Sequence, residues 1–182
     1  MEKSLRHILL RVEKRGTRER VLDAALELLG ERGASAMTVR AAEQAAEVPH
    51  GTVRHHFGDR AGLVRALFGR LADREAPPAE GGPLAAMEDW LGPGRTLALA
   101  RYELFLLAAR DPSLRPHLVA ARERFVAQAA ERVGPASAPA IVAAIDGLLL
   151  DALVRGDADP ARLGALLRHV LPPSVALTAE RI

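Results

Sequence analysis

Residues 34–59 read ASAMTVRAAEQAAEVPHGTVRHHFGD, and this stretch decides the fold. Its pattern predicts two short helices joined by a tight turn, the first over 38–46 and the second over 50–57. Pro49 ends the first helix because proline lacks the N–H group that a helix interior uses. The Gly–Asp pair at 58–59 predicts a second turn after the second helix.

Longer helices flank this pair on both sides. Over 17–32, apolar residues recur every three or four positions and trace one stripe of a helix, which Thr17 can cap and Gly33 can end. Asp59 can cap a further helix over 60–75. Together the four helices can bury one small core, for which the candidates are Val39, Ala42, Ala45, Val48, Val53, Phe57, Leu63 and Leu67.

The remaining sequence also predicts helices and no sheet, because Ala, Leu, Arg and Glu are abundant while aromatic residues make up only 3% of the chain. Proline and glycine over 76–83 mark a linker between an N-terminal domain over 1–75 and a second helical domain over 84–182. Helices in the second domain are expected at roughly 84–91, 94–110, 113–133, 138–155 and 160–171. The predicted fold class is therefore all-α.

Composition excludes several classes of protein. The chain contains no cysteine, which excludes disulfides, thiolate zinc sites and a cysteine nucleophile. No apolar run reaches the roughly 18 residues of a membrane span, and the first 16 residues lack the apolar stretch of a signal peptide. We therefore expect a cytoplasmic protein with no membrane partner.

The charge is distributed unevenly. Residues 1–75 hold 14 Lys or Arg against 11 Asp or Glu, whereas residues 76–182 hold 11 against 12. A mildly basic first half suggests an acidic polymer as partner. An ordinary solvated surface would explain the same excess.

The second short helix carries the chemistry that double-stranded DNA requires. A helix fits the major groove, which is about 12 Å wide, and Arg, His and Thr can contact phosphates or base edges there. At the start of the preceding helix, free backbone N–H groups can bind a phosphate. The candidate DNA-contacting residues in the two helices are Thr38, Val39, Arg40, His50, Gly51, Thr52, Arg54, His55 and His56.

The stretch from Thr38 to Leu63 resembles the DNA-binding domain of TetR-type transcriptional regulators. The positions that carry the resemblance are Thr38, Ala42, Ala45, Val48, Gly51, Val53, His56, Phe57, Arg60 and Leu63. The resemblance implies a helix–turn–helix reader, with Arg60 among its DNA contacts, and a second domain that binds a small effector and forms a homodimer. A repressor released from a palindromic operator by its effector is the expected function.

Three positions depart from the family pattern. Glu47 stands where the family usually has glycine, Pro49 where it has a capping serine, and Arg54 where it has a phosphate-contacting tyrosine. Arg54 can contact phosphate itself because it is charged. The departures leave open a reader that no longer binds DNA, in which case the chain would be a dimeric interaction protein.

Basic residues before Thr17, namely Arg11, Lys14 and Arg15, together with Arg18 just after it, form an arm that is a candidate for DNA binding. In the family such arms often lie along the DNA backbone or in the minor groove. A terminus without any fixed contact is the alternative.

In the second domain, aromatic and apolar residues suggest a pocket for the effector that the resemblance implies. The candidates are Met87, Trp90, Tyr102, Phe105, Leu106 and His117. Each of them could instead be a plain core residue. For the subunit contact, a surplus of apolar residues in the last two helices points to Leu149, Leu153, Leu163, Leu167 and Val170, with a monomeric bundle as the alternative.

Enzymatic activity, a metal and a cofactor are not expected. The chain lacks a phosphate-binding glycine loop and a nucleophile elbow, and Asp146 and Asp151 are interpreted as surface or capping charges. His55 and His56 are neighbours that point about 100° apart on a helix, so they cannot easily share an ion.

Overall fold

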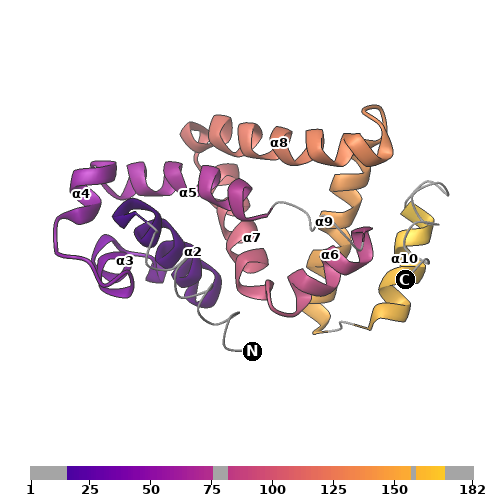
Figure 1. Ribbon diagram of the computed structural model, residues 1–182, viewed down its shortest axis with the longest axis horizontal. Coiled ribbons are helices and arrows are strands. Elements are labelled where there is room, and N and C mark those ends of the chain that lie inside the picture. The colour runs from indigo at the N-terminus through magenta and orange to yellow at the C-terminus, as the bar shows by residue number, and fades with distance from the viewer. Residues whose placement is uncertain (1–15, 76–81, 157–158, 171–182) are drawn as a thin grey trace, which may run out of the picture.

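The computed structural model describes residues 16–75, 82–156 and 159–170, and within these ranges every regular element is a helix, which confirms the all-α class (Figure 1). The elements are α2 (Thr17–Ala36), α3 (Val39–Ala45), α4 (Thr52–Phe57), α5 (Arg60–Arg74), α6 (Gly82–Leu91), α7 (Arg95–Arg110), the short 3-10 helix η1 (Pro112–Leu114), α8 (Arg115–Val133), α9 (Ala138–Arg155) and α10 (Pro160–Val170).

Some predictions fall outside the described residues. These are the arm residues Arg11, Lys14 and Arg15, and the linker predicted over 76–83 except for its last two positions.

Two predicted helix caps are present. The side chain of Thr38 accepts a hydrogen bond from the N–H of Ala41 at 3.1 Å and starts α3. The carboxylate of Asp59 accepts the N–H of Gly62 at 2.7 Å and starts α5. Each cap satisfies a backbone donor that has no partner inside its own helix.

The two ends of α2 differ in how well they were predicted. Thr17 is the first helical residue rather than the cap, which is Gly16 and offers no side-chain bond. Gly33 ends the regular helix as predicted, because its φ of 75° lies in the left-handed region that glycine tolerates. A further short turn then reaches Ala36.

The first hydrophobic core lies among α2, α3, α4 and α5. Ala45, predicted as a core residue, is exposed, and Ala46 is buried in its place. Ala42 and Ala46 are four positions apart and share the inward face of the chain, whereas Ala45 is turned about 100° from Ala46. Of the other predicted core residues, Ala42, Val53, Leu63 and Leu67 are buried and Val39, Val48 and Phe57 are half-buried.

Helix α7 belongs to the second domain by sequence, yet it also completes this first core. Ala100, Leu104 and Ala108 of α7 are 0% exposed within the first cluster. Gly30 of α2 marks the contact, because a Cβ at this position would lie 2.0 Å from the backbone oxygen of Thr96. The core therefore continues across the boundary that the Pro/Gly-rich segment suggested.

A second hydrophobic core lies at the other end of the molecule, where α6, α9 and α10 pack together with α7 (Figure 1). In this view α7 stands between the two ends, and α8 runs across the top from the α5 side to α9. Helix α7 therefore contributes side chains to both cores.

In the described ranges, no single helix is long and apolar enough to cross a membrane. The one pair that passes jointly by length and composition, Pro112–Val133 with Ala138–Arg155, is bent by 109°.

Candidate DNA-binding surface and effector cavity

The turn between α3 and α4 is held by Glu43, a buried side chain of α3. One carboxylate oxygen, Oε1, accepts the N–H groups of Gly51 at 3.0 Å and of Val53 at 2.9 Å. The other, Oε2, lies 3.2 Å from Nδ1 of His50. Glu43 therefore caps α4 from the preceding helix, which replaces the side-chain cap that Pro49 cannot supply.

The pKa of Glu43 is lowered from its ordinary value of 4.5, above all by the hydrogen bond from the N–H of Val53. Bonds from the two N–H groups stabilise the charged carboxylate more than the neutral acid, which is the physical cause of the shift. The sequence did not predict this role of Glu43, because nothing in the spacing of the neighbouring residues marks it as the cap of a helix that begins nine residues later.

The same turn contains two residues with positive φ. Gly51 has φ 89° at the cap position of α4, and a Cβ there would meet no atom within 4 Å, so the backbone angle is what favours glycine. Glu47 has φ 52° and is the one non-glycine residue with positive φ in the described chain. Glycine tolerates a positive φ without strain, which explains why proteins of the family that this stretch resembles usually have glycine where Glu47 stands.

Four of the predicted DNA-contacting side chains are exposed and have no polar partner among the described residues. They are Arg40 near the start of α3 and Arg54, His55 and His56 on α4. The rings of His55 and His56 touch edge to face, with centroids 4.9 Å apart. These four side chains, which we call the reader surface, present unpaired nitrogen atoms to solvent.

Other predicted contacts already hold the protein together. Arg60 donates through Nε to the carbonyl oxygen of Met37 at 3.1 Å and through Nη2 to that of Ala34 at 2.9 Å. Its guanidinium therefore fixes the connection between α2 and α3. On the opposite side of that connection, Glu103 of α7 accepts the N–H of Ala34 at 3.2 Å.

The remaining predicted DNA contacts have further roles. The hydroxyl of Thr52 donates to the carbonyl of Pro49 at 2.6 Å, and Val39 packs half-buried against the first core. Arg18 lies over the ring of Phe57, with its Cζ 5.2 Å from the centroid. The exposed hydroxyl of Thr38 is occupied as the cap of α3.

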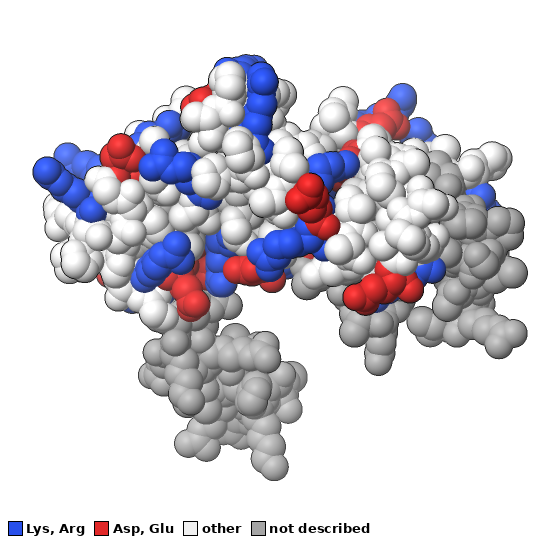
Figure 2. Space-filling view, turned by 90° about the horizontal axis from the view of Figure 1, so that it is seen from above, with Lys and Arg blue, Asp and Glu red and all other residues white. Residues whose placement is uncertain are grey.

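Basic and acidic residues are equal in number at this end of the molecule, but they are not equally exposed. Residues 16–75 contain nine arginines and nine acidic residues. Three of these acids are buried, namely Asp23, Glu43 and Glu75. The exposed surface of α2 to α5 therefore has a basic excess, and Figure 2 shows its basic side chains spread over that end with acidic ones beside several of them.

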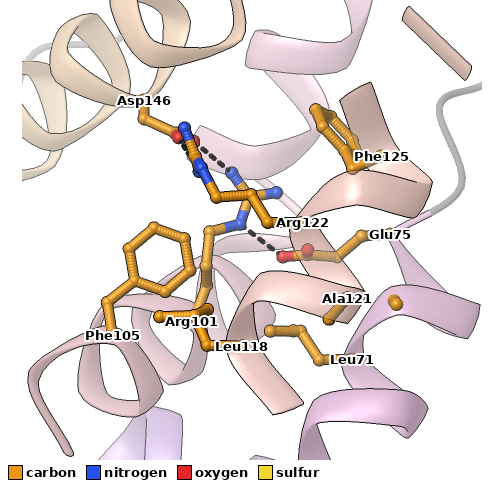
Figure 3. A pocket seen from close by; sticks show the side chains of 10 residues that line it. Leu71, Glu75, Arg101, Phe105, Leu118, Ala121, Arg122, Phe125 and Asp146 are labelled. Carbon is orange, nitrogen blue, oxygen red and sulfur yellow. Dashed lines mark hydrogen bonds and ion pairs between the residues drawn. The ribbon is translucent and has the colours of Figure 1, made fainter. Parts of the chain in front are cut away.

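A small cavity lies between α5, α7, α8 and α9, and its volume is ≈ 30 Å³ (Figure 3). A cavity of this size holds about one water molecule, whereas a drug-sized ligand needs roughly 300–1,000 Å³. The cavity is therefore closed to such a ligand in this conformation. Its lining residues are Leu71, Ala72, Glu75, Arg101, Phe105, Leu118, Ala121, Arg122, Phe125 and Asp146.

Arg101 of α7 is the centre of this cavity. Its Nε donates to Glu75 at the end of α5 at 2.5 Å, and its Nη1 donates to Asp146 of α9 at 3.1 Å. Asp146 also accepts a hydrogen bond from Arg122 of α8. Figure 3 shows Arg101 between the two carboxylates, so four helices meet through one network of ions.

Burial sets the protonation behaviour of the acidic groups in and beside this network. Burial raises the pKa of the Glu75 carboxyl, while Arg101 acts in the opposite direction. Burial also raises the pKa of Tyr102, whose hydroxyl donates to the backbone oxygen of Asp146 at 2.8 Å. Asp146 was interpreted from sequence as a surface or capping charge, and this is corrected here because its side chain is only 14% exposed and pairs with two arginines.

The predicted effector residues occupy different places. Phe105 lines the cavity, whereas Trp90 belongs to the second core and its ring centroid lies 4.7 Å from Cζ of Arg101. Met87 is fully buried in the second core, and Tyr102 is half-buried beside that core. Leu106 is 49% exposed.

His117 lies away from this cavity. Its ring stacks on Phe68 in an open groove of ≈ 280 Å³ between α5 and α8, which Arg18, Arg65 and Arg124 also line. The structure thus brings Phe105 and Trp90 to one place and His117 to another. The sequence did not predict that four charged residues line this cavity, namely Glu75, Arg101, Arg122 and Asp146.

The residues predicted for the subunit contact are mostly internal. Leu149, Leu153, Leu163 and Leu167 are between 0% and 7% exposed, because they form the second core within one chain. The side chain of Val170 lies outside the described residues. On α9, the large apolar side chains that remain exposed are Leu150 at 44% and Val154 at 77%.

Within the described residues, no group of three or more His, Asp or Glu side chains could hold a metal ion.

Comparison with known proteins gives matches over both halves of the chain. Residues 21–67 match the family described as bacterial regulatory proteins of the tetR family, and residues 81–173 match the family described as tetracyclin repressor-like, C-terminal domain. The HTH-type transcriptional repressor AcnR of Corynebacterium diphtheriae is 36% identical over 101 residues, which are 54% of this chain and 53% of that protein. The chain thus spans about half the length of this curated relative.

Solved structures match over nearly the whole described fold. A TetR-family member from Streptomyces coelicolor A3 has a TM-score of 0.71 at 30% identity, over 87% of this chain and 99% of that one. The multidrug binding protein EbrR complexed with ethidium has a TM-score of 0.69 at 30% identity, over 86% of this chain and 99% of that one.

Proposed function

Since the chain belongs to the TetR family of bacterial regulatory proteins, which bind DNA through a helix–turn–helix, we propose that it represses transcription as a homodimer on a palindromic operator. A small effector bound in the second domain then releases it. The observation that carries this proposal is the reader surface, which presents Arg40, Arg54, His55 and His56 unpaired on two helices fixed by Glu43.

The reader surface supports binding to DNA in two ways. The guanidinium groups of Arg40 and Arg54 supply charge for phosphates, and the histidines on α4 supply donors for base edges. Glu43 keeps α4 at a fixed angle to α3, so these side chains enter the groove as one rigid unit. One argument for a helix–turn–helix that no longer binds DNA was that Pro49 cannot cap α4. Glu43 supplies that cap instead, which weakens this argument.

An exposed apolar strip on α9 supports the homodimer. Gly147, Leu150 and Val154 follow one another at spacings of three and four, so they share one face of the helix, and all three are exposed. A two-fold contact along this strip would bury the strip on both chains. It would also hold two copies of α4 at a fixed separation, near 34–36 Å or a multiple for half-sites on one side of the DNA.

Helix α7 supports the coupling between effector and DNA. Arg101 binds Glu75 at the end of α5, and Glu103, two residues along the same helix, binds the backbone before α3. An effector that moves α7 therefore changes both supports of the reader helices. A tenfold loss of operator affinity needs a difference of only about 1.4 kcal/mol between the two conformations.

The relatives support two further parts of the proposal. AcnR is a transcriptional repressor, which favours repression over activation here. EbrR has been solved with ethidium, which favours a small organic effector for the second domain of this chain. Because the proposed target is genomic DNA, we place the protein in the cytoplasm.

Binding to the DNA that flanks the protein's own gene tests the proposal. The purified protein is titrated against that DNA at 50 mM and 200 mM salt with random competitor present. Binding that resists competitor and maps to a palindrome is expected. Binding that disappears with competitor at both salt concentrations would contradict a sequence-specific repressor.

The homodimer is tested separately by light scattering after size exclusion. The double variant Leu150→Lys/Val154→Lys should be monomeric, while Leu106→Lys, an equally exposed apolar position on α7, should remain a dimer. A wild-type monomer at micromolar concentration would refute this part of the proposal.

A further inference from the structure

Arg101 has one nitrogen atom that no described residue binds. The residue is 3% exposed, and two of its three nitrogen atoms donate to Glu75 and Asp146. The third, Nη2, is buried and has no hydrogen-bond partner in the part of the chain that the structure describes. A buried donor without an acceptor is costly, and more so when it belongs to a charged group. This nitrogen atom therefore favours any ligand that brings an acceptor.

The surroundings of this nitrogen atom define the rest of the ligand. The Cζ atom of Arg101 lies 4.7 Å from the ring centroid of Trp90 and 5.6 Å from that of Phe125. Leu71, Leu118 and Ala121 complete an apolar wall on the α5 and α8 sides. Apolar walls beside one polar group that lacks a partner suit a small molecule with one charged end and an aromatic or aliphatic body.

The ion pairs that already exist in the cavity indicate whether the effector is an anion or a cation. Both carboxylates of the cavity, Glu75 and Asp146, already accept hydrogen bonds from arginines, whereas Nη2 of Arg101 has no acceptor among the described residues. A cation would also approach Arg101, whose unused N–H groups repel it. A carboxylate matches the planar guanidinium and forms charge-assisted bonds that a neutral hydroxyl cannot equal.

We propose that the effector is a small organic carboxylate whose headgroup binds Nη2 of Arg101 and whose body packs against Phe105 and Phe125. The proposal rests on the effector response proposed above and specifies its chemistry. The cavity must widen to admit such a molecule, and Arg122 is the more exposed arginine of the network, with a side chain that is 32% exposed against 3% for Arg101. Arg122 can therefore turn outward to solvent while Arg101 stays in place.

Binding at Arg101 has a direct consequence for α5. The carboxylate bound at Nη2 shares the positive charge of the guanidinium with Glu75 and repels the Glu75 carboxylate, and Glu75 is the C-cap residue of α5. Weakening this ion pair loosens the link between α7 and the helix that supports the reader. Binding of the effector to Arg101 thus itself weakens the contact that supports the DNA-binding helices.

The experiment compares headgroups on a fixed body. Three series are used, each with a carboxylate, an alcohol and an amine: phenylacetate, 3-phenylpropionate and octanoate with their alcohol and amine counterparts. Trp90 is the only tryptophan of the chain and lies against Arg101, so its fluorescence reports binding in the cavity. Operator affinity without and with each compound is measured on the same protein by fluorescence anisotropy of labelled DNA.

Two variants assign the effect to Arg101. Arg101→Lys keeps the charge but removes the planar fork and its second terminal nitrogen atom, and Arg95→Lys makes the same change at an exposed position of the same helix. We expect a carboxylate to bind at least tenfold more tightly than its alcohol and amine and to weaken operator binding. Arg101→Lys should abolish that preference, and Arg95→Lys should retain it.

Failure of this inference is distinguishable from failure of the proposed function. The inference is overturned if no carboxylate exceeds its alcohol and amine counterparts, if an amine or ethidium binds more tightly, or if Arg101→Lys keeps the preference. In those cases specific operator binding by the unliganded wild type would still support the repressor. Absence of specific operator binding would instead refute the proposed function, whatever the headgroup preference.

Discussion

The carboxylate of Glu43 accepts the N–H of Val53 at 2.9 Å, so the first helix of the reader caps the second. In this arrangement the cap lies ten residues before the N–H that it binds. The angle between α3 and α4 is then fixed by a side chain that is itself buried, rather than by the six-residue connection over 46–51 alone. Stability of the turn and the ability to bind DNA should therefore be lost together.

Replacement of Glu43 by glutamine should lower the melting temperature at neutral pH and weaken operator binding. Because folding lowers the pKa of Glu43, its contribution is present above about pH 5 and is lost as the pH falls through the folded-state pKa. Melting followed by circular dichroism from pH 3 to pH 7 should thus give a gap in melting temperature between wild type and variant that narrows as the pH falls below the ordinary pKa of 4.5. Glu27→Gln, at an exposed position of α2, should produce no such pH-dependent gap, and a Glu43→Gln gap that stays constant from pH 7 to pH 3 would argue against the capping role.

Removal of charge from the reader surface should change the salt dependence of operator binding. The double variant Arg40→Ala/Arg54→Ala loses two guanidinium groups that are proposed to contact phosphates. Each lost contact should reduce the slope of log K against log salt by about 0.9. The control, Arg168→Ala on α10, removes one charge far from the reader surface and should leave the slope unchanged. Equal slopes for the wild type and the double variant would remove these arginines from the interface.

Glu47→Gly should stabilise the protein, which is an unusual result for a substitution to glycine. The positive φ of 52° at Glu47 strains any residue with a Cβ, and glycine removes that strain while adding freedom to the unfolded chain. A net gain of up to about 1 kcal/mol in the free energy of unfolding is expected from urea denaturation. The same change within α2, Glu27→Gly, should cost about 1 kcal/mol, and a loss at both positions would contradict the argument.

Gly30→Ala should be destabilising because the added Cβ would meet the backbone oxygen of Thr96 at 2.0 Å. Separating α2 from α7 by the required distance should cost about 1–3 kcal/mol, as overpacking does. Gly69→Ala on α5 is the matched control, since a Cβ there meets nothing within 4 Å and should add about 0.5–1 kcal/mol through helix propensity. Chemical denaturation of both variants measures the difference, and equal stabilities would show that α2 and α7 are not in close contact.

Local signals predicted the helices well because each depends on neighbouring residues. The cap at Thr38 and the breaks at Gly33 and Pro49 involve spacings of only a few positions, and α3 was placed within one residue at each end. Helix α4 begins at Thr52, two residues later than expected, because Gly51 adopts a left-handed conformation and cannot be part of a helix.

Long-range pairs were not predictable in the same way. Glu75, Arg101, Arg122 and Asp146 are separated by more than twenty residues each, so no periodicity in the sequence connects them. Arginines and acids on helices are usually solvated, and only the packing of the helices shows that Glu75 and Arg101 are buried and that Asp146 and Arg122 pair with each other. Leu149 and Leu163 were predicted at a subunit contact, yet they lie in the second core of one chain. A single sequence does not distinguish these two kinds of apolar surface.

The close contact of Gly30 with Thr96 also limits how this protein can be taken apart. A fragment cut at the Pro/Gly-rich segment would leave the first core open along the line where Ala100, Leu104 and Ala108 now lie. A chimera that joins this reader to a foreign sensor should therefore carry α7 with it as a rigid adaptor. The natural place for the joint is after η1, and not between the two domains that the sequence suggests.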